Sequence, residues 1–278
     1  MSTQSKIFDL LKDKMQIVNI VFILTIVLPI LYPISMPIPI SKEVRDAYEY
    51  IDALPDGTLA VYSVHLSASI WPEIGPPFTA VLNHIIEKDI EIVFISDAAQ
   101  GPALIERGIE LIGGKSKLGE YGEDWVLLGY LPGAFEVSLA TFMEDSSIYS
   151  KDYYGNLVSE LPLMSKLPAG KDADVFLGNV GGISTLEPVV RQAGPYLPIV
   201  VCGISSSGYS LSMPYYEAGA LVGVVPPGSG GAAYEYLTGK PGLAMQTQVT
   251  LSFPNLFMVL VIILTNMSFL LKKVRGGT

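Results

Sequence analysis

Residues 91–96 read Glu-Ile-Val-Phe-Ile-Ser, with four β-branched or aromatic residues in a row. Such a continuous apolar run predicts a strand buried on both faces of a sheet. The amphipathic segment 102–112 that follows predicts a helix. Working outward in both directions, strands are predicted at 59–66, 125–130, 174–177 and 197–203, and helices at 76–87, 135–144 and 185–193. This alternation indicates an α/β fold, a mostly parallel sheet with helices on both faces.

The two ends of the chain differ from this central part because both carry long apolar runs. Residues 253–271 contain no charge, and Lys272, Lys273 and Arg275 follow directly. About 20 apolar residues in a helix cross a hydrocarbon core of about 30 Å. A second apolar run covers residues 17–32. We therefore expect one N-terminal and one C-terminal transmembrane helix to flank the α/β domain, with the lipid bilayer as a partner.

These runs divide the chain into six parts. They are a tail at 1–16, a first transmembrane helix at 17–32, a proline-rich stalk at 33–40, an α/β domain at 41–250, a second transmembrane helix at 253–271 and a basic tail at 272–278. Basic residues that flank a span tend to stay in the cytoplasm. We therefore expect a two-pass protein of the cell membrane, with both termini cytoplasmic and the domain extracytoplasmic. The alternative for residues 17–32 is a cleaved signal peptide, although residues 33–40 lack a small-x-small cleavage site.

Charge and cysteine content exclude several classes of function. Residues 36–252 hold 25 of the 27 acidic residues but only 11 of the 17 basic ones, a net charge of −14. Nucleic acid is therefore excluded as a partner, because an acidic surface cannot replace phosphate counterions. The single cysteine, Cys202, forms no internal disulfide, and with His65 and His84 as the only histidines we expect neither a zinc site nor another cofactor.

A glycine-rich loop, Gly178-Asn-Val-Gly-Gly-Ile-Ser184, is the most specific candidate site. It lies where a predicted strand ends and a helix begins, which is where ligands bind in open parallel sheets. Such a loop can present free backbone N–H groups to an anion. The candidate ligand-binding residues are Gly178, Asn179, Gly181, Gly182 and Ser184. The alternative is a tight turn in which Ser184 and Glu187 form a capping box.

A hydrolytic site is another possibility. His65 lies at the end of the first predicted strand and Asp97 follows the strand at 91–96. They could act as a base and its orienting carboxylate, with Ser205 or a neighbouring serine as the nucleophile. The chain has no G-x-S-x-G nucleophile elbow.

The segment 205–242 is rich in glycine, proline and tyrosine. Ser212 is expected to cap a helix that carries Gly219 and Gly223 as a pair of small residues on one face. Tyr215 and Tyr216 lie beside them, and tyrosine is common at subunit interfaces. These four residues are therefore the predicted interface of a homo-oligomer.

The same segment carries a family resemblance. Pro214-Tyr-Tyr-Glu-Ala-Gly219, then Gly223, then Gly230-Gly-Ala-Ala-Tyr-Glu235 resemble the C-terminal signature of an uncharacterised family of bacterial and archaeal membrane-anchored proteins. The resemblance extends over residues 129–242, and it departs from the family pattern at Pro226-Pro-Gly-Ser229. It implies a prokaryotic membrane protein and no known activity.

Three functional hypotheses follow. The first is a membrane-anchored, self-associating scaffold or interaction domain without catalytic activity, since no catalytic motif is recognisable. The second is a receptor domain that binds a small anionic ligand at the glycine-rich loop. The third is a serine-type hydrolase.

Overall fold

The structure is a computed structural model that describes residues 3–31, 38–130 and 133–275. It divides into two units. One is the domain Ile38–Met245, and the other comprises Met1–Pro37 and Gln246–Thr278. The predicted stalk at 33–40 lies mostly outside the described residues.

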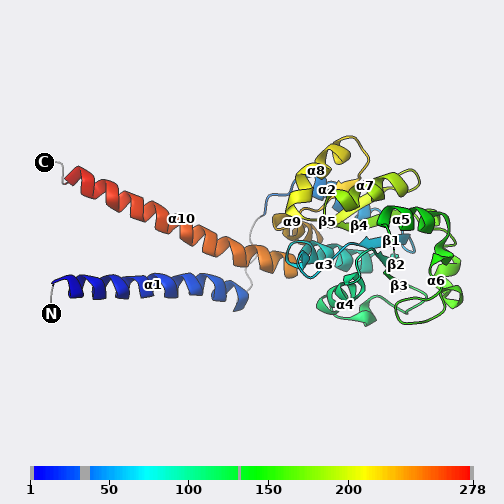
Figure 1. Ribbon diagram of the computed structural model, residues 1–278, viewed down its shortest axis with the longest axis horizontal. Helices are drawn as coiled ribbons and strands as arrows, with labels where there is room; N and C mark the ends of the chain where they lie inside the picture. Colours follow the sequence, from blue (N-terminus) through cyan, green and yellow to red (C-terminus); the bar gives the residue numbers. More distant parts are fainter. Residues whose placement is uncertain (1–2, 32–37, 131–132, 276–278) are drawn as a thin grey trace. The chain divides into compact units, whose positions relative to one another are not determined.

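The domain is built on a sheet of six parallel strands in the order β3-β2-β1-β4-β5-β6 (Figure 1). The strands are β1 (Leu59–Val64), β2 (Glu91–Ser96), β3 (Trp125–Tyr130), β4 (Val175–Val180), β5 (Ile199–Ile204) and β6 (Gly223–Val224). The expected α/β fold is therefore confirmed, and in the described residues all strand pairs are parallel. The short strand β6 was not predicted.

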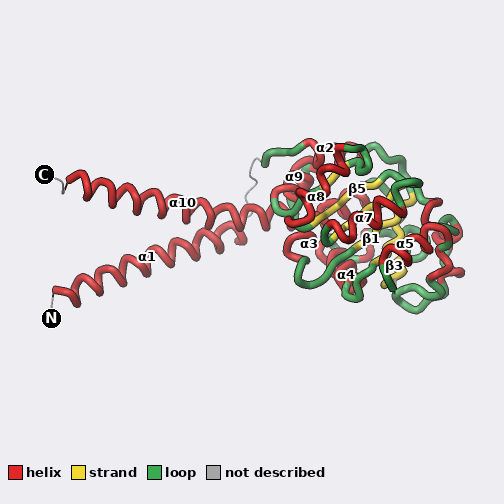
Figure 2. The backbone as a smooth tube through the Cα atoms, turned by 45° about the horizontal axis from the view of Figure 1, so that its top comes forward, coloured by secondary structure: helices red, strands yellow, loops and turns green. Residues whose placement is uncertain are grey.

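Helices cover both faces of the sheet (Figure 2). One core packs under α2 (Lys42–Asp52), α3 (Trp71–Glu87), α4 (Gly101–Leu111) and α9 (Ser229–Thr238), and the other under α5 (Phe135–Glu144), α6 (Pro162–Ser165), α7 (Ile183–Gln192) and α8 (Ser206–Glu217). Short 3-10 helices lie at Lys115–Lys117, Ser146–Ile148, Val158–Glu160 and Gly170–Asp172. Alternate strand residues such as Tyr62 and Val61 enter opposite cores, which explains the continuous apolar runs.

The strand order creates a switch point between β1 and β4. From β1 the chain proceeds to β2 and β3 on one side, and it then returns to build β4, β5 and β6 on the other side. The connections that leave the adjacent ends of β1 and β4 therefore turn to opposite faces of the sheet. In open parallel sheets this divergence leaves the crevice in which ligands bind.

The segment after β5 differs from its prediction. Helix α8 begins after Ser205, whose side chain accepts a hydrogen bond from the Gly208 N–H, and it ends at Glu217. Gly219 then adopts a left-handed turn with φ +78°, and Gly223 lies in β6. The prediction that Ser212 caps a helix with Gly219 and Gly223 on one face is therefore wrong. At Gly223 a Cβ atom would lie 2.4 Å from the Ala47 nitrogen, so glycine permits close packing of β6 against α2.

The terminal unit contains α1 (Thr3–Leu31) and most of α10 (Leu243–Arg275). Within the described residues, one helical stretch, Leu243–Met267, is long and apolar enough to cross a membrane. The apolar part of α1 is Gln16–Leu31, which is shorter than a typical span. The C-terminal anchor thus has support in the structure, whereas the N-terminal anchor stays a prediction.

The first turn of α10 is capped by a buried carboxylate from α9. Glu235 accepts hydrogen bonds from the backbone N–H groups of Gly242 (2.7 Å), Ala244 (2.9 Å) and Met245 (2.7 Å). Burial raises the pKa of Glu235 above its usual value, against the effect of these hydrogen bonds. A carboxylate at this position satisfies N–H groups that have no partner inside the helix.

Candidate functional site

The candidate site lies at the carboxyl ends of β1 and β4, where the glycine-rich loop and the loop after His65 run side by side. The His65 N–H donates to the Asn179 carbonyl at 2.8 Å, which extends the pairing of the two strands by one residue. Gly181 follows beside the His65 carbonyl, 3.8 Å from the position that a Cβ on Gly181 would take. The tertiary structure therefore brings together two of the sequence-predicted candidates.

The five predicted ligand residues occupy four different environments. Gly178 and Asn179 are buried in β4, Gly181 lies in the turn, Gly182 is the N-cap of α7, and Ser184 is exposed in the first turn of that helix. The Gly182 N–H donates to Thr185 Oγ1 at 3.2 Å, and the Thr185 hydroxyl donates to the Gly182 carbonyl at 2.9 Å. The capping box of Ser184 and Glu187 is therefore wrong, because the helix begins before Ser184.

The N-terminus of α7 is open to an incoming group. The first N–H groups of a helix have no carbonyl partner within it. In the part of the chain that the structure describes, no acceptor is directed at the N–H groups of Ile183 and Ser184. Cβ atoms placed on Gly181 and Gly182 would meet no atom closer than 3.5 Å, which is ordinary van der Waals contact, so a single added carbon would fit at either position. This arrangement suits an anion that accepts hydrogen bonds from the backbone.

His65 is held between two side chains under the loop. Its Nε2 lies 2.9 Å from the Ser63 hydroxyl oxygen, and its Nδ1 contacts the Asp97 carboxylate. The edge of the ring packs against Phe135 of α5, with ring centroids 4.2 Å apart. The His65–Asp97 contact agrees with the hydrolase hypothesis, but the partner of Nε2 is Ser63, which sequence reasoning missed. The period of two in a strand could have indicated it, because Ser63 and His65 lie on one face of β1.

The serine expected as the nucleophile has another role. Ser205 Oγ accepts from the Gly208 N–H at 3.2 Å and lies 3.2 Å from Ser207 Oγ, so it caps α8. Ser63 is fully buried, and His65 is only 3% exposed. A nucleophile needs both a free base and access to a substrate. The geometry therefore assigns Ser63, His65 and Asp97 to holding the switch-point loops in place.

Asn179 is a further unusual feature of the site. Its side chain is completely buried, and neither amide atom has a hydrogen-bond partner among the described residues. A Cβ on Gly203 of the neighbouring strand would lie 2.4 Å from Asn179 Nδ2, so the glycine makes room for the amide. An unsatisfied buried amide costs about 1–3 kcal/mol. Such a group calls for an explanation, and the described core holds others, the Tyr62 hydroxyl and the Trp125 indole N–H.

Comparison with known proteins identifies no relative whose function could be considered for this chain. No protein-family model matches this chain, and no curated protein matches it. Among the described residues, no three His, Cys, Asp or Glu side chains lie close enough together to hold a metal ion.

The predicted interface residues are used within the domain. The Tyr215 hydroxyl donates to Glu187 of α7 at 3.2 Å, and the Tyr216 hydroxyl donates to Asp46 of α2 at 2.5 Å. The ammonium of Lys42 donates to Tyr216 at 3.0 Å. These tyrosines therefore connect α8 to its neighbours, while Gly219 and Gly223 do not share a helix face.

Proposed function

We propose that the domain is a membrane-anchored receptor for a small anionic ligand that binds at the N-terminus of α7. The observation that carries this proposal is the open, glycine-lined helix terminus at the switch point between β1 and β4. The N–H groups of Ile183 and Ser184 would bind the anion, and the positive end of the helix dipole would add to the attraction. Gly181 and Gly182 allow a ligand to approach the backbone closely.

The apolar helix α10 supports the membrane anchor in this proposal, as does the resemblance to membrane-anchored prokaryotic proteins. The N-terminal anchor, the stalk and an extracytoplasmic position of the domain are part of the same proposal. Self-association is the remaining expectation from the sequence, and the mass of the purified chain in detergent tests it. A monomer at micromolar concentration would argue against the scaffold hypothesis.

Thermal unfolding of the full chain in detergent tests ligand binding directly. Inorganic phosphate is the probe, and sodium chloride at equal ionic strength is the reference. A ligand at about ten times its Kd stabilises the folded state by about 1.4 kcal/mol. We expect phosphate to raise the unfolding midpoint of the natural chain, and we expect Gly182→Val to lose this response, since its side chain would cover the N–H groups.

Ser184→Ala is the matched control because it keeps the backbone N–H and removes only an exposed hydroxyl. It should respond to phosphate as the natural chain does. Equal responses of Gly182→Val and the natural chain, or equal effects of phosphate and chloride, would refute the proposed site.

A further inference from the structure

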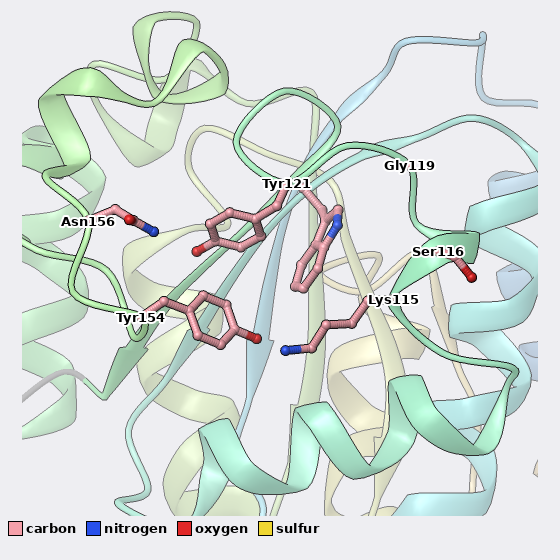
Figure 3. A pocket seen from close by; sticks show the side chains of 7 residues that line it. Lys115, Ser116, Gly119, Tyr121, Tyr154 and Asn156 are labelled. Atoms are coloured by element: carbon pink, nitrogen blue, oxygen red, sulfur yellow. The ribbon is translucent and has the colours of Figure 1, made fainter.

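A cavity lies beside β3, away from the switch point between β1 and β4. It has a volume of about 390 Å³ and is lined by Lys115, Ser116, Gly119, Tyr121, Trp125, Tyr154 and Asn156 (Figure 3). Trp125 is the first residue of β3, and the strands are parallel, so the cavity lies near the amino ends of the strands. The N-terminus of α7 follows a carboxyl end. The two sites are therefore separate, and this inference does not depend on the proposed function.

Three aromatic rings form rigid walls. Tyr121 meets Trp125 edge to face, with centroids 4.8 Å apart, and it meets Tyr154 in the same way at 5.0 Å. Trp125 is only 2% exposed and packs against Phe94 in the core. The Tyr121 hydroxyl donates to Asp152 at 2.6 Å, which fixes its ring. A volume of this size and preformed aromatic walls are typical of small-molecule sites.

The charge of the lining differs from that of the domain as a whole. The lining residues include one cation, Lys115, and no carboxylate, whereas residues 36–252 carry a net charge of −14. The Lys115 ammonium lies 4.4 Å from the centroid of the Tyr154 ring and 2.8 Å from Glu106 Oε1. Figure 3 shows the ends of the Lys115 and Tyr154 side chains pointing toward one another.

Lys115 has the capacity to bind a further group. An ammonium has three N–H donors, and Glu106 takes one of them, while the same Glu106 oxygen also accepts from the Tyr154 hydroxyl at 2.8 Å. The hydrogen bond to Glu106, and then the nearby Tyr154 hydroxyl, raise the pKa of Lys115 to about 12, so that it is charged at neutral pH.

We propose that this cavity binds a small aromatic anion, whose ring packs against Tyr121 and Tyr154 and whose carboxylate accepts a hydrogen bond from Lys115. An aromatic cation would lie beside the Lys115 ammonium, and the Glu106 carboxylate that could attract it already accepts from Lys115 and from the Tyr154 hydroxyl. An aliphatic anion would lose the contact with the aromatic rings.

Calorimetric titration of the full chain in lipid nanodiscs, with empty nanodiscs as the blank, tests the proposal. The probes are 2-naphthoate, cyclohexanecarboxylate and 2-naphthylmethylammonium. We expect saturable binding of 2-naphthoate alone. Lys115→Met keeps the length of the side chain and removes its charge, so affinity for 2-naphthoate should fall about tenfold. Glu106→Gln frees Lys115 from its ion pair and should raise the affinity.

Lys117→Met is the control, because Lys117 lies in the same 3-10 helix and does not line the cavity. It should bind 2-naphthoate as the natural chain does. The proposal is overturned if 2-naphthoate shows no saturable binding, if the cationic or the aliphatic probe binds as well, or if Lys115→Met and Lys117→Met have equal affinities.

Discussion

The N-termini of α7 and α8 lie after neighbouring strands of one sheet, yet they are completed in opposite ways. At α8 the Glu73 carboxylate accepts hydrogen bonds from the Ser206 N–H at 2.7 Å and from the Ser206 hydroxyl at 3.0 Å, and Ser205 caps the Gly208 N–H. At α7 the N-cap is Gly182, and in the described part of the chain no carboxylate accepts from its first turn.

One end of the sheet therefore carries both a helix N-terminus that accepts a carboxylate of the same chain and one that, among the described residues, accepts none. Helix α8 receives its negative charge from α3 of the same chain, so it has no need of an external anion. Helix α7 begins at the switch point, and among the described residues the N–H groups of Ile183 and Ser184 have no acceptor, which is the basis of the proposed anion site.

Gly208→Val should have the largest effect, because it removes the close packing of the two helix termini. A Cβ on Gly208 would lie 2.9 Å from the Gly182 Cα and 3.0 Å from Ile204 Cγ1. We expect the free energy of unfolding to fall by about 3 kcal/mol, measured by chemical denaturation, and the phosphate response to disappear. Ser210→Val places the same side chain at an exposed position of α8 and should cost far less. Similar losses for both variants would show that the contact with Gly182 is unimportant.

Glu73→Gln should convert the closed site into an open one. Removing an exposed carboxylate from a helix N-terminus costs about 0.3–1 kcal/mol. We expect the unfolding midpoint to fall and phosphate to restore more stability to this variant than to the natural chain, since α8 can then also accept an anion. Glu110→Gln, in the last turn of α4, serves as the control and should leave the phosphate response unchanged. An unaltered phosphate response in Glu73→Gln would mean that the carboxylate does not close α8.

Of the three variants, Thr185→Val should change the phosphate response least. It removes the hydroxyl that bonds both backbone groups of Gly182 but keeps the shape of the side chain. We expect a loss of about 1 kcal/mol in the free energy of unfolding, with the phosphate response retained because the N–H groups of Ile183 and Ser184 are unaffected. Loss of that response would place the anion on the Thr185 hydroxyl instead.

The agreement between sequence and structure is best where one physical effect dominates. The strand at 91–96 and the helix at 135–144 have the bounds predicted for them, since their apolar patterns match one period each. The segment 205–242 was misassigned because its glycines serve different purposes. Gly208 allows α8 to approach Gly182, Gly219 supplies a positive φ and Gly223 packs against α2. A single sequence shows only that the residues are small.

Part of the candidate site could be predicted from the sequence, because the ends of parallel strands can be located from their apolar patterns. The glycine-rich loop and His65 were found because strand ends are where parallel sheets bind ligands. Ser63 was missed inside an apolar strand, and the role of Glu73 depends on a partner far away in the sequence.

The sequence by itself determined the alternation of buried strands and amphipathic helices, the apolar C-terminal helix and the acidic character of the domain, because these depend on local composition and period. The tertiary structure alone decided the strand order, and with it which loops meet. Strand pairing is a long-range choice, so only the folded chain reveals that Glu73 closes α8 while the terminus of α7 stays open.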